Sequence, residues 1–263
     1  MGVIAKYKFD QTIYENFIPE FNSGFTYTIT DETDTDGLTI RTIESDSLPQ
    51  RIKFGYSNKE AENDVLSLKE INYVNISNVA SLDALCANCK NLIKINTENW
   101  DTSQIIYMNS MFNNCSSLTS LDVSNFNTEN VTSMTNMFIN CSSLTSLDLS
   151  NFNTEKVTNM TSMFAGCSSL IHLDISSFNG SALTTGCGSM FFGCVLLQEI
   201  VFPKKFITNK CTNISAMFRN CPSLKYVDVS DWDTSSVATI NQTFNGCKSL
   251  TSLDLSSWDT TNV

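Results

Sequence analysis

Cysteine and histidine are the residues in this chain most able to do nucleophilic or metal chemistry, and their positions argue against both. His172 is the one histidine, so a Ser/His or Cys/His catalytic system or a multi-His metal site would have to pass through it. Only Cys86 and Cys89 form a CxxC motif, without the second motif that a zinc site needs. The sequence therefore predicts no catalytic residues, no metal, no cofactor and no enzyme.

The other cysteines follow a period instead. Seven of the ten are spaced 26 or 27 residues apart, and we interpret each thiol as a small buried packing group. They are Cys89, Cys115, Cys141, Cys167, Cys194, Cys221 and Cys247.

Carboxylates form two patterns of possible binding residues. Four of them lie between residues 31 and 36, before Gly37, but Ile43 occupies the position where an EF-hand would place its closing Glu. We interpret this segment as the solvated tip of a hairpin. The second pattern is an acidic column with one Asp in each period, at Asp122, Asp148, Asp174, Asp228 and Asp254.

The acidic column has two interpretations. Stacked about 4.8 Å apart, the carboxylates would repel one another unless hydrogen bonds or cations intervene. Each Asp either accepts hydrogen bonds from nearby N–H or Ser hydroxyl groups and organises the repeats, or belongs to an acidic strip that binds a partner. Two positions earlier the side chain varies freely, which suits partner choice. This variable column is Lys94, Ser120, Ser146, His172, Glu199, Tyr226 and Ser252, and within it His172, Glu199 and Tyr226 join the acidic column as candidate binding residues.

The elements that position these columns repeat with the same period, as expected for a solenoid. The unit reads C-x-S-L-x-x-L-D-x-S-x-[FW]-x-T-x-x-V-x-x-M-x-x-M-F-x-x-C. Alternation around Leu121 and Val123 predicts a short strand with one exposed face. The spacing of the apolar residues from Val131 to Cys141 predicts a helical return, with Thr128 as its N-terminal cap. Stacked units would form a continuous parallel sheet on one face and a helical layer on the other.

Two domains are predicted. Residues 1–62 lack the repeat and read as a small β-rich domain, with strands at 3–9, 25–29, 38–40 and 51–55 and a tight hairpin at Asp36-Gly37. Residues 63–263 hold a degenerate first rung and about seven repeats of 26–27 residues, the last incomplete, so that the chain continues or another chain covers the end. Residues 1–62 are expected to cap the solenoid or to dock the chain onto an assembly or a second copy.

Charge narrows the class of partner. The net charge of −11 and the pI near 4.5 disfavour nucleic acid and anionic lipid. Apolar runs are too short for a signal peptide or direct membrane insertion. The partner is therefore expected to be a protein or a glycan.

The repeat from Cys115 to Cys141 resembles the BspA-like leucine-rich-repeat family of bacterial surface proteins. This resemblance covers about 200 of the 263 residues, and the unit with Leu197, Ile200 and Pro203 resembles the proline-containing variant of that repeat. It implies an α/β solenoid of leucine-rich repeats, a right-handed ribbon with a parallel sheet, and a role in extracellular adhesion or recognition. The N-terminal segment resembles proteins encoded near bacteriophage tail genes.

These observations lead to the hypothesis of a non-enzymatic recognition protein on a bacterial surface or a phage tail. The alternative is a structural spacer or decoration subunit whose repeats contact only sister chains.

Overall fold

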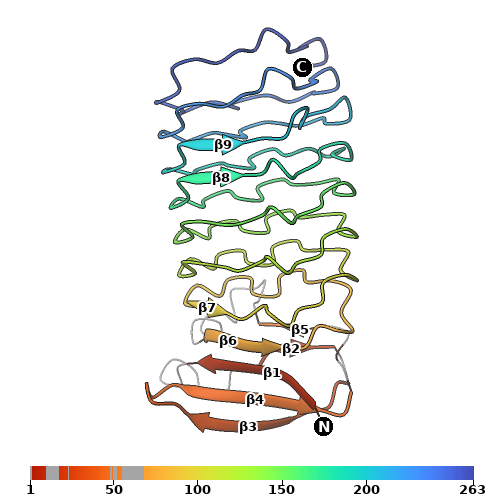
Figure 1. The fold of residues 1–263 in the computed structure, drawn as a ribbon, viewed down its shortest axis with the longest axis vertical. Helices are drawn as coiled ribbons and strands as arrows, with labels where there is room; N and C mark the ends of the chain where they lie inside the picture. The colour runs from red at the N-terminus through yellow and green to blue at the C-terminus, as the bar shows by residue number, and fades with distance from the viewer. Residues whose placement is uncertain (1, 10–17, 23, 48, 50–51, 55–67) are drawn as a thin grey trace.

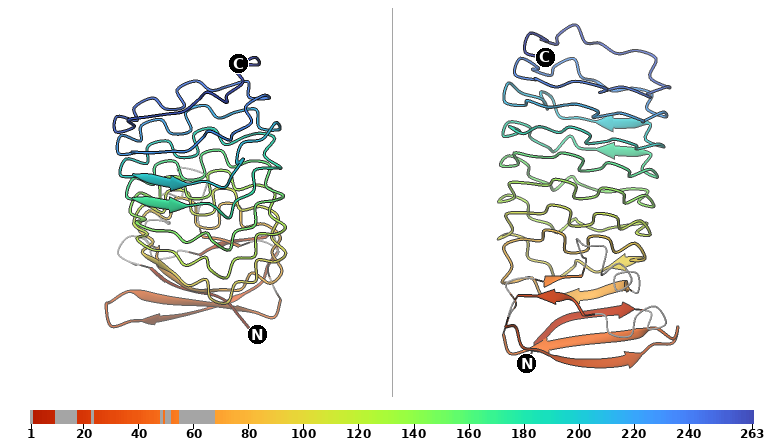
Figure 2. Two further views of the ribbon diagram at one scale, coloured as in Figure 1. Left: turned by 45° about the horizontal axis from the view of Figure 1, so that its top comes forward. Right: turned by 180° about the vertical axis from the view of Figure 1, so that it is seen from behind.

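The repeats stack in a single column above an N-terminal group of strands. The computed structural model of the chain describes residues 2–9, 18–22, 24–47, 49, 52–54 and 68–263. Successive units lie on one another along the long axis from the N-terminal strands to the C-terminal end (Figures 1 and 2). The predicted repeat architecture is confirmed at this level.

The N-terminal strands and the first rungs share one sheet. Its order is β3 (Thr28–Thr33), β4 (Thr39–Ser45), β1 (Gly2–Phe9), β6 (Leu68–Val74) and β7 (Lys94–Ile95). β6 pairs antiparallel with β1 and parallel with β7, so it joins the two parts of the chain. The predicted domain boundary at 62/63 lies outside the described residues.

The hairpin predicted at the acidic segment is confirmed, with its first strand at β3 rather than at 25–29. β3 and β4 pair antiparallel. Asp34 Oδ1 accepts hydrogen bonds from the N–H groups of Asp36 and Leu38, both at 2.9 Å, and Asp34 Oδ2 lies 3.0 Å from Lys8 Nζ. Asp34 therefore holds the turn together through Oδ1 and ties it to the neighbouring strand β1 through Oδ2. The strand predicted at 51–55 is described only at β5 (Ile52–Lys53), which pairs with β2 (Glu20–Phe21).

The prediction of a helical return is wrong, and so is the α part of the predicted α/β fold. None of the described residues forms a helix. Between Val131 and Cys141 the N–H groups alternate in use: those of Met137 and Cys141 bond back three residues, whereas those of Met134 and Phe138 donate to the next unit. The donors to the next unit reach carbonyl oxygens 25 residues ahead, at 3.1 and 2.9 Å. An α-helix pairs its N–H groups with carbonyls four residues back in the same segment, and here most of them donate to neighbouring units instead.

Backbone residues in the left-handed conformation bend this segment into successive turns. Asn136 and Asn140 both have φ of 58°, and the corresponding residue before the cysteine is Gly166 in the following unit, with φ of 72°. Asn and Gly enter this conformation at the lowest cost. Gly166 also leaves room for Asn140, whose Oδ1 would lie 2.1 Å from a Cβ built at that glycine. The apolar side chains predicted to share a helix face are nevertheless all buried.

The prediction of a continuous parallel sheet is also wrong. Beyond β7, the described repeats contain one paired set of strands, β8 (His172–Asp174) with β9 (Glu199–Val201), and isolated parallel bridges. In the unit 115–140 the Ser124 N–H, which a ladder could have used, donates to Asp122 Oδ1 within its own unit. Local turns thus compete with strand pairing for the same donors.

A buried threonine column connects successive units. Thr128 Oγ1 donates to Asn153 O at 2.9 Å and accepts from Asn153 N–H at 2.8 Å, so one hydroxyl closes two hydrogen bonds to the next unit. Thr128 was predicted to cap a helix of its own unit, and the structure instead uses it between units. The same pair of bonds recurs at Thr102, Thr154 and Thr234.

Aromatic and thiol columns fill the interior. The rings of Phe112, Phe138 and Phe164 stack with centroids 5.8 and 5.7 Å apart. The burial expected for the repeat cysteines is confirmed, since those from Cys89 to Cys221 are buried and Cys247 is half-buried. Cys141 Sγ donates to Phe112 O in the preceding unit at 3.1 Å, and burial raises the pKa of Cys141 to about 12. These thiols are packing groups with a hydrogen bond, not exposed nucleophiles.

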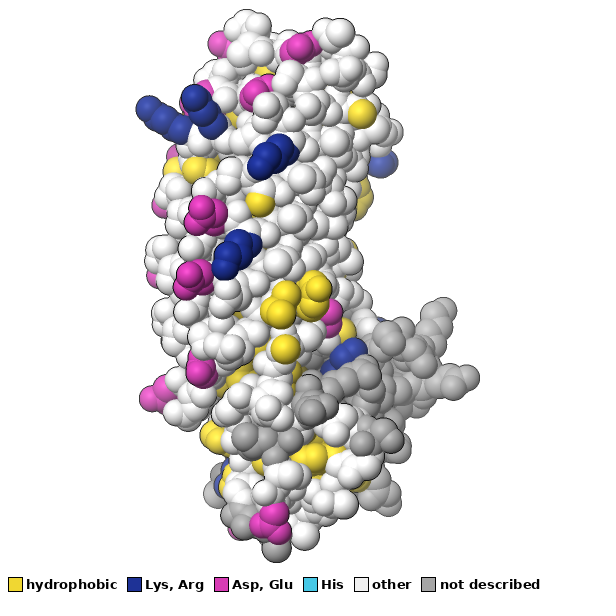
Figure 3. Space-filling model, turned by 90° about the vertical axis from the view of Figure 1, so that its right-hand side faces the viewer, with side chains coloured by type: hydrophobic (Ala, Val, Ile, Leu, Met, Phe, Trp, Pro, Cys, Tyr) yellow, Lys and Arg dark blue, Asp and Glu magenta, His cyan; other side chains and the backbone are white. Residues whose placement is uncertain are grey.

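Neutral polar groups dominate the outer surface. Figure 3 shows one flank of the stack with scattered charged side chains on a largely uncharged background. This agrees with a charged fraction of only 16% in the sequence. Among the described residues, no helix is long and apolar enough to cross a membrane.

Candidate functional site

All eight candidate binding residues lie on the surface, along one side of the stack. In the variable column, His172 is paired with Glu199 in parallel strands, and Glu199 forms a bridge to Tyr226. The acidic column is divided in two, because Val201 takes the place of Asp where β9 pairs with Asp174. The structure therefore brings the variable column together across consecutive units and interrupts the acidic column at one of them.

The acidic column organises turns inside each unit. Asp148 Oδ1 accepts from Ser150 N–H at 3.0 Å, and Asp228 Oδ1 accepts from both the N–H and the hydroxyl of Ser230 at 3.1 and 2.7 Å. Donors from the serine two residues ahead lower the pKa of each Asp in this column. This geometry fits the structural interpretation for one carboxylate oxygen, and it leaves the second oxygen of Asp228 without a bond among the described residues.

One unit departs from the repeat beside Tyr226. In the unit 194–220 the segment Phe202 to Phe206 replaces the usual Asp turn, and Lys205 N–H donates to Asp231 Oδ2 in the next unit at 3.0 Å. The Phe202 ring turns inward, with its centroid 5.3 Å from that of Trp232. Beside it lies a hollow of about 230 Å³ lined by Glu199, Lys204, Tyr226, Asp228 and Asp231, among others.

Tyr226 separates this hollow from a second one. The second hollow has a volume of about 310 Å³, and its lining includes Tyr226, Asp228, Ser252 and Asp254. Tyr226 is 55% exposed, whereas the repeat commonly places Ser at its position, as at Ser120. The exposed ring can stack on a flat or apolar group of a ligand, and the carboxylates on both sides can accept hydrogen bonds from the same ligand.

A third hollow on the same side lies between regular units. Its volume is about 270 Å³, and it is lined by Asp148, Asp174 and the Leu and Ser residues around them. No aromatic side chain contributes to it. The surroundings of Tyr226 therefore form the most differentiated part of the candidate face.

The remaining candidate, His172, lies at the near edge of this region. Its Nδ1 is 3.4 Å from Glu199 Oε2, and both side chains are more than half exposed. Among the described residues, no group of three or more His, Cys, Asp or Glu could hold a metal ion. The arrangement thus offers hydrogen-bond acceptors, a ring and negative charge to a ligand.

Lys204 and Asp231 line the first hollow and were not among the predicted residues. The signal that could have found them is the irregular unit itself, which gains one residue and a proline at Pro203. A departure from an otherwise strict repeat marks the place where the surface changes shape.

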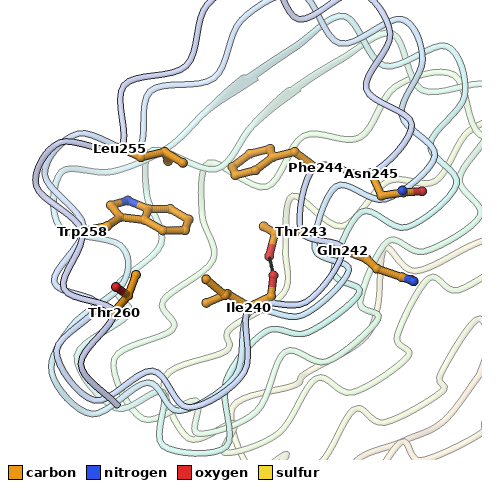
Figure 4. A pocket seen from close by; sticks show the side chains of 8 residues that line it. All are labelled: Ile240, Gln242, Thr243, Phe244, Asn245, Leu255, Trp258 and Thr260. Carbon is orange, nitrogen blue, oxygen red and sulfur yellow. Dashed lines mark hydrogen bonds between the residues drawn. The ribbon is translucent and has the colours of Figure 1, made fainter. Parts of the chain in front are cut away.

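A further hollow, of about 370 Å³, lies at the last repeat and has a different character (Figure 4). Its lining includes Ile240, Phe244 and Trp258, which belong to the apolar columns of the repeat interior. The Phe244 ring continues the stack, 5.3 Å from Phe218. This surface is therefore equivalent to the face that each interior unit presents to the next one.

The stacked 26–27-residue units and their shared interior columns define a repeat protein. The family model described as "Mycoplasma protein of unknown function, DUF285" matches residues 57–178, 120–225 and 185–263 in overlapping segments. The chain belongs to this family. Searches of curated proteins and of solved structures gave no match.

Proposed function

We propose that this chain is a non-enzymatic recognition or adhesion protein that binds a protein or glycan partner through the side of the stack carrying Tyr226. The observation that carries the proposal is the pair of hollows sharing Tyr226 and Asp228. A ring more than half exposed beside concave surfaces is typical of a binding anchor.

The finer classification belongs to the same proposal. The repeat with its Asp turn and Met-Phe return supports a BspA-like leucine-rich-repeat solenoid, and the family described for Mycoplasma proteins supports a bacterial source. We place the protein at a bacterial surface or in a phage tail, with the N-terminal strands as its mounting part. In this position the column would extend the binding side away from its support.

Binding of the fluorescently labelled protein to whole bacterial and animal cells tests the proposal. Tyr226→Ser introduces the residue found at Ser120 and should lower binding about tenfold without moving the unfolding midpoint. Tyr107→Ser is the matched control, because Tyr107 is 45% exposed and bridges to Ser81 and Ser133 on another side of each unit. The control should bind like the unchanged protein.

Two results would overturn the proposal. Equal losses in the two variants would show that Tyr226 is no anchor. Absence of binding to all cells tested would favour the alternative, a structural spacer whose repeats contact only sister chains.

A further inference from the structure

The charged side chains that line the two hollows are mostly acidic. Four carboxylates line the two hollows, from Glu199, Asp228, Asp231 and Asp254, and Lys204 supplies the single ammonium group in the same linings. Asp231 already accepts from the Lys205 N–H. Negative charge therefore dominates the concave surface on both sides of the ring.

Some of these oxygens are available to a ligand. The N–H and the hydroxyl of Ser230 both donate to Oδ1 of Asp228, and Oδ2 has no partner among the described residues. The Glu199 carboxylate contacts His172, and this contact balances the charge of Glu199 only when the imidazole is protonated. A cationic donor entering either hollow would find acceptors without displacing a bond of the fold.

The same protein already holds a guanidinium between a carboxylate and an aromatic ring. Arg41 donates to both carboxylate oxygens of Asp31, at 2.7 and 2.6 Å, and its Cζ lies 4.8 Å from the centroid of the Phe9 ring. The Tyr226 site offers the two acceptor types of that arrangement, a ring face and carboxylates, without the cation. A guanidinium suits both at once, because it is planar and donates in a fixed fork.

We propose that the group seated on Tyr226 is an arginine side chain of a basic partner protein, held between Asp228 and the neighbouring carboxylates. This inference rests on the proposed function, because it names the partner of that site. Charge complementarity favours this partner over a neutral glycan, since sugar hydroxyls can donate to these carboxylates but are not attracted by their net negative charge. The net charge of −11 further favours approach of a basic partner.

A fluorescent peptide of repeating Gly-Ser-Arg tests the assignment by anisotropy, with a second peptide carrying citrulline in place of arginine. Citrulline keeps the shape and loses the charge. The arginine peptide should bind at least about tenfold more tightly than the citrulline peptide. Its affinity should decrease when the NaCl concentration is raised from about 20 to about 300 mM. Asp228→Asn, whose amide oxygen can still accept from Ser230, and Tyr226→Ser should each weaken arginine binding severalfold.

Asp122→Asn is the matched control, since Asp122 makes the same turn on a regular unit far from Tyr226. Equal losses in Asp122→Asn and Asp228→Asn would overturn the site, because they would show general attraction to an acidic chain. Equal affinity for the citrulline peptide would overturn the role of charge.

Cell binding separates this inference from the proposed function. If the protein binds cells through Tyr226 and the arginine peptide does not compete with this binding, the proposed recognition function is retained and the arginine partner is refuted. Tyr226-dependent binding to an array of neutral glycans would assign the site to a sugar instead. Arginine-peptide binding at Tyr226, with no cell bound, would sustain the site and overturn the adhesion role.

Discussion

Replacing Thr128 by valine removes one hydroxyl and leaves the shape of the side chain almost unchanged. Thr128 is 1% exposed, and its hydroxyl both donates to and accepts from the backbone of Asn153 in the next unit. In the Thr128→Val protein the Asn153 N–H and carbonyl groups lose these partners at the contact between two units. The substitution thus tests whether side chains, and not only backbone bonds, hold neighbouring units together.

The expected loss follows from the two orphaned groups. A buried backbone donor or acceptor without a partner costs about 1–3 kcal/mol. Two such groups, partly accessible to water, should lower the free energy of unfolding by about 2–4 kcal/mol. Thr128→Ser keeps the hydroxyl and loses one buried methyl group, so it should cost only about 1 kcal/mol.

Urea denaturation followed by circular dichroism measures these differences. Thr145→Val is the control, because Thr145 is exposed and its hydroxyl makes one long contact of 3.4 Å to Thr119 O. That change should stay within about 0.5 kcal/mol. A loss below about 0.5 kcal/mol for Thr128→Val, or a larger loss for Thr128→Ser, would refute the reasoning that the hydroxyl joins the units.

Further predictions concern the backbone, the thiols and acid. Gly180→Ala should destabilise strongly, because its Cβ would lie 1.7 Å from the Phe206 carbonyl oxygen of the next unit; an unchanged melting temperature would contradict this contact. A thiol reagent should leave Cys141 and the other buried repeat cysteines unlabelled until the protein unfolds, as counted by mass spectrometry, and fast native labelling would contradict their burial. The lowered pKa of Asp148 and its column means that their contribution is complete above about pH 4 and is lost as pH falls through the folded-state pKa. The urea concentration at the midpoint of unfolding should therefore decrease as the pH is lowered below about 4. Asp148→Asn, which keeps an acceptor for the turn, should make this decrease smaller.

Much of the interior was predictable from the repeat. Met134, Phe138 and Cys141 recur at fixed positions, and all three are buried without exposure. Likewise Asp148 and Tyr226 were assigned to the outside, where they lie. Burial can be read from a repeat because a position that is apolar in every unit faces the same stacked interior.

The conformation of the return segment was mispredicted because apolar spacing alone does not distinguish a helix from a series of turns. Steps of three residues suit both, and the deciding donors bond to another unit. An Asn or Gly directly before each repeat cysteine, as at Asn140 and Gly166, was a sequence signal for left-handed turns that the helix prediction overlooked. Similarly, Thr128 was predicted to cap a helix of its own unit, but its hydroxyl bonds to Asn153, 25 residues ahead.

The sequence by itself determined the period, the apolar columns and the polar exterior, because these depend on which side chains water excludes. Only the tertiary structure decided how the backbone meets its hydrogen-bonding needs. Donors in the return segment are shared between units, and Asp turns withdraw others from a continuous sheet. It also decided the surroundings of Tyr226, because one hollow forms where the irregular unit lies against the unit of Tyr226 and the other where that unit lies against the last one.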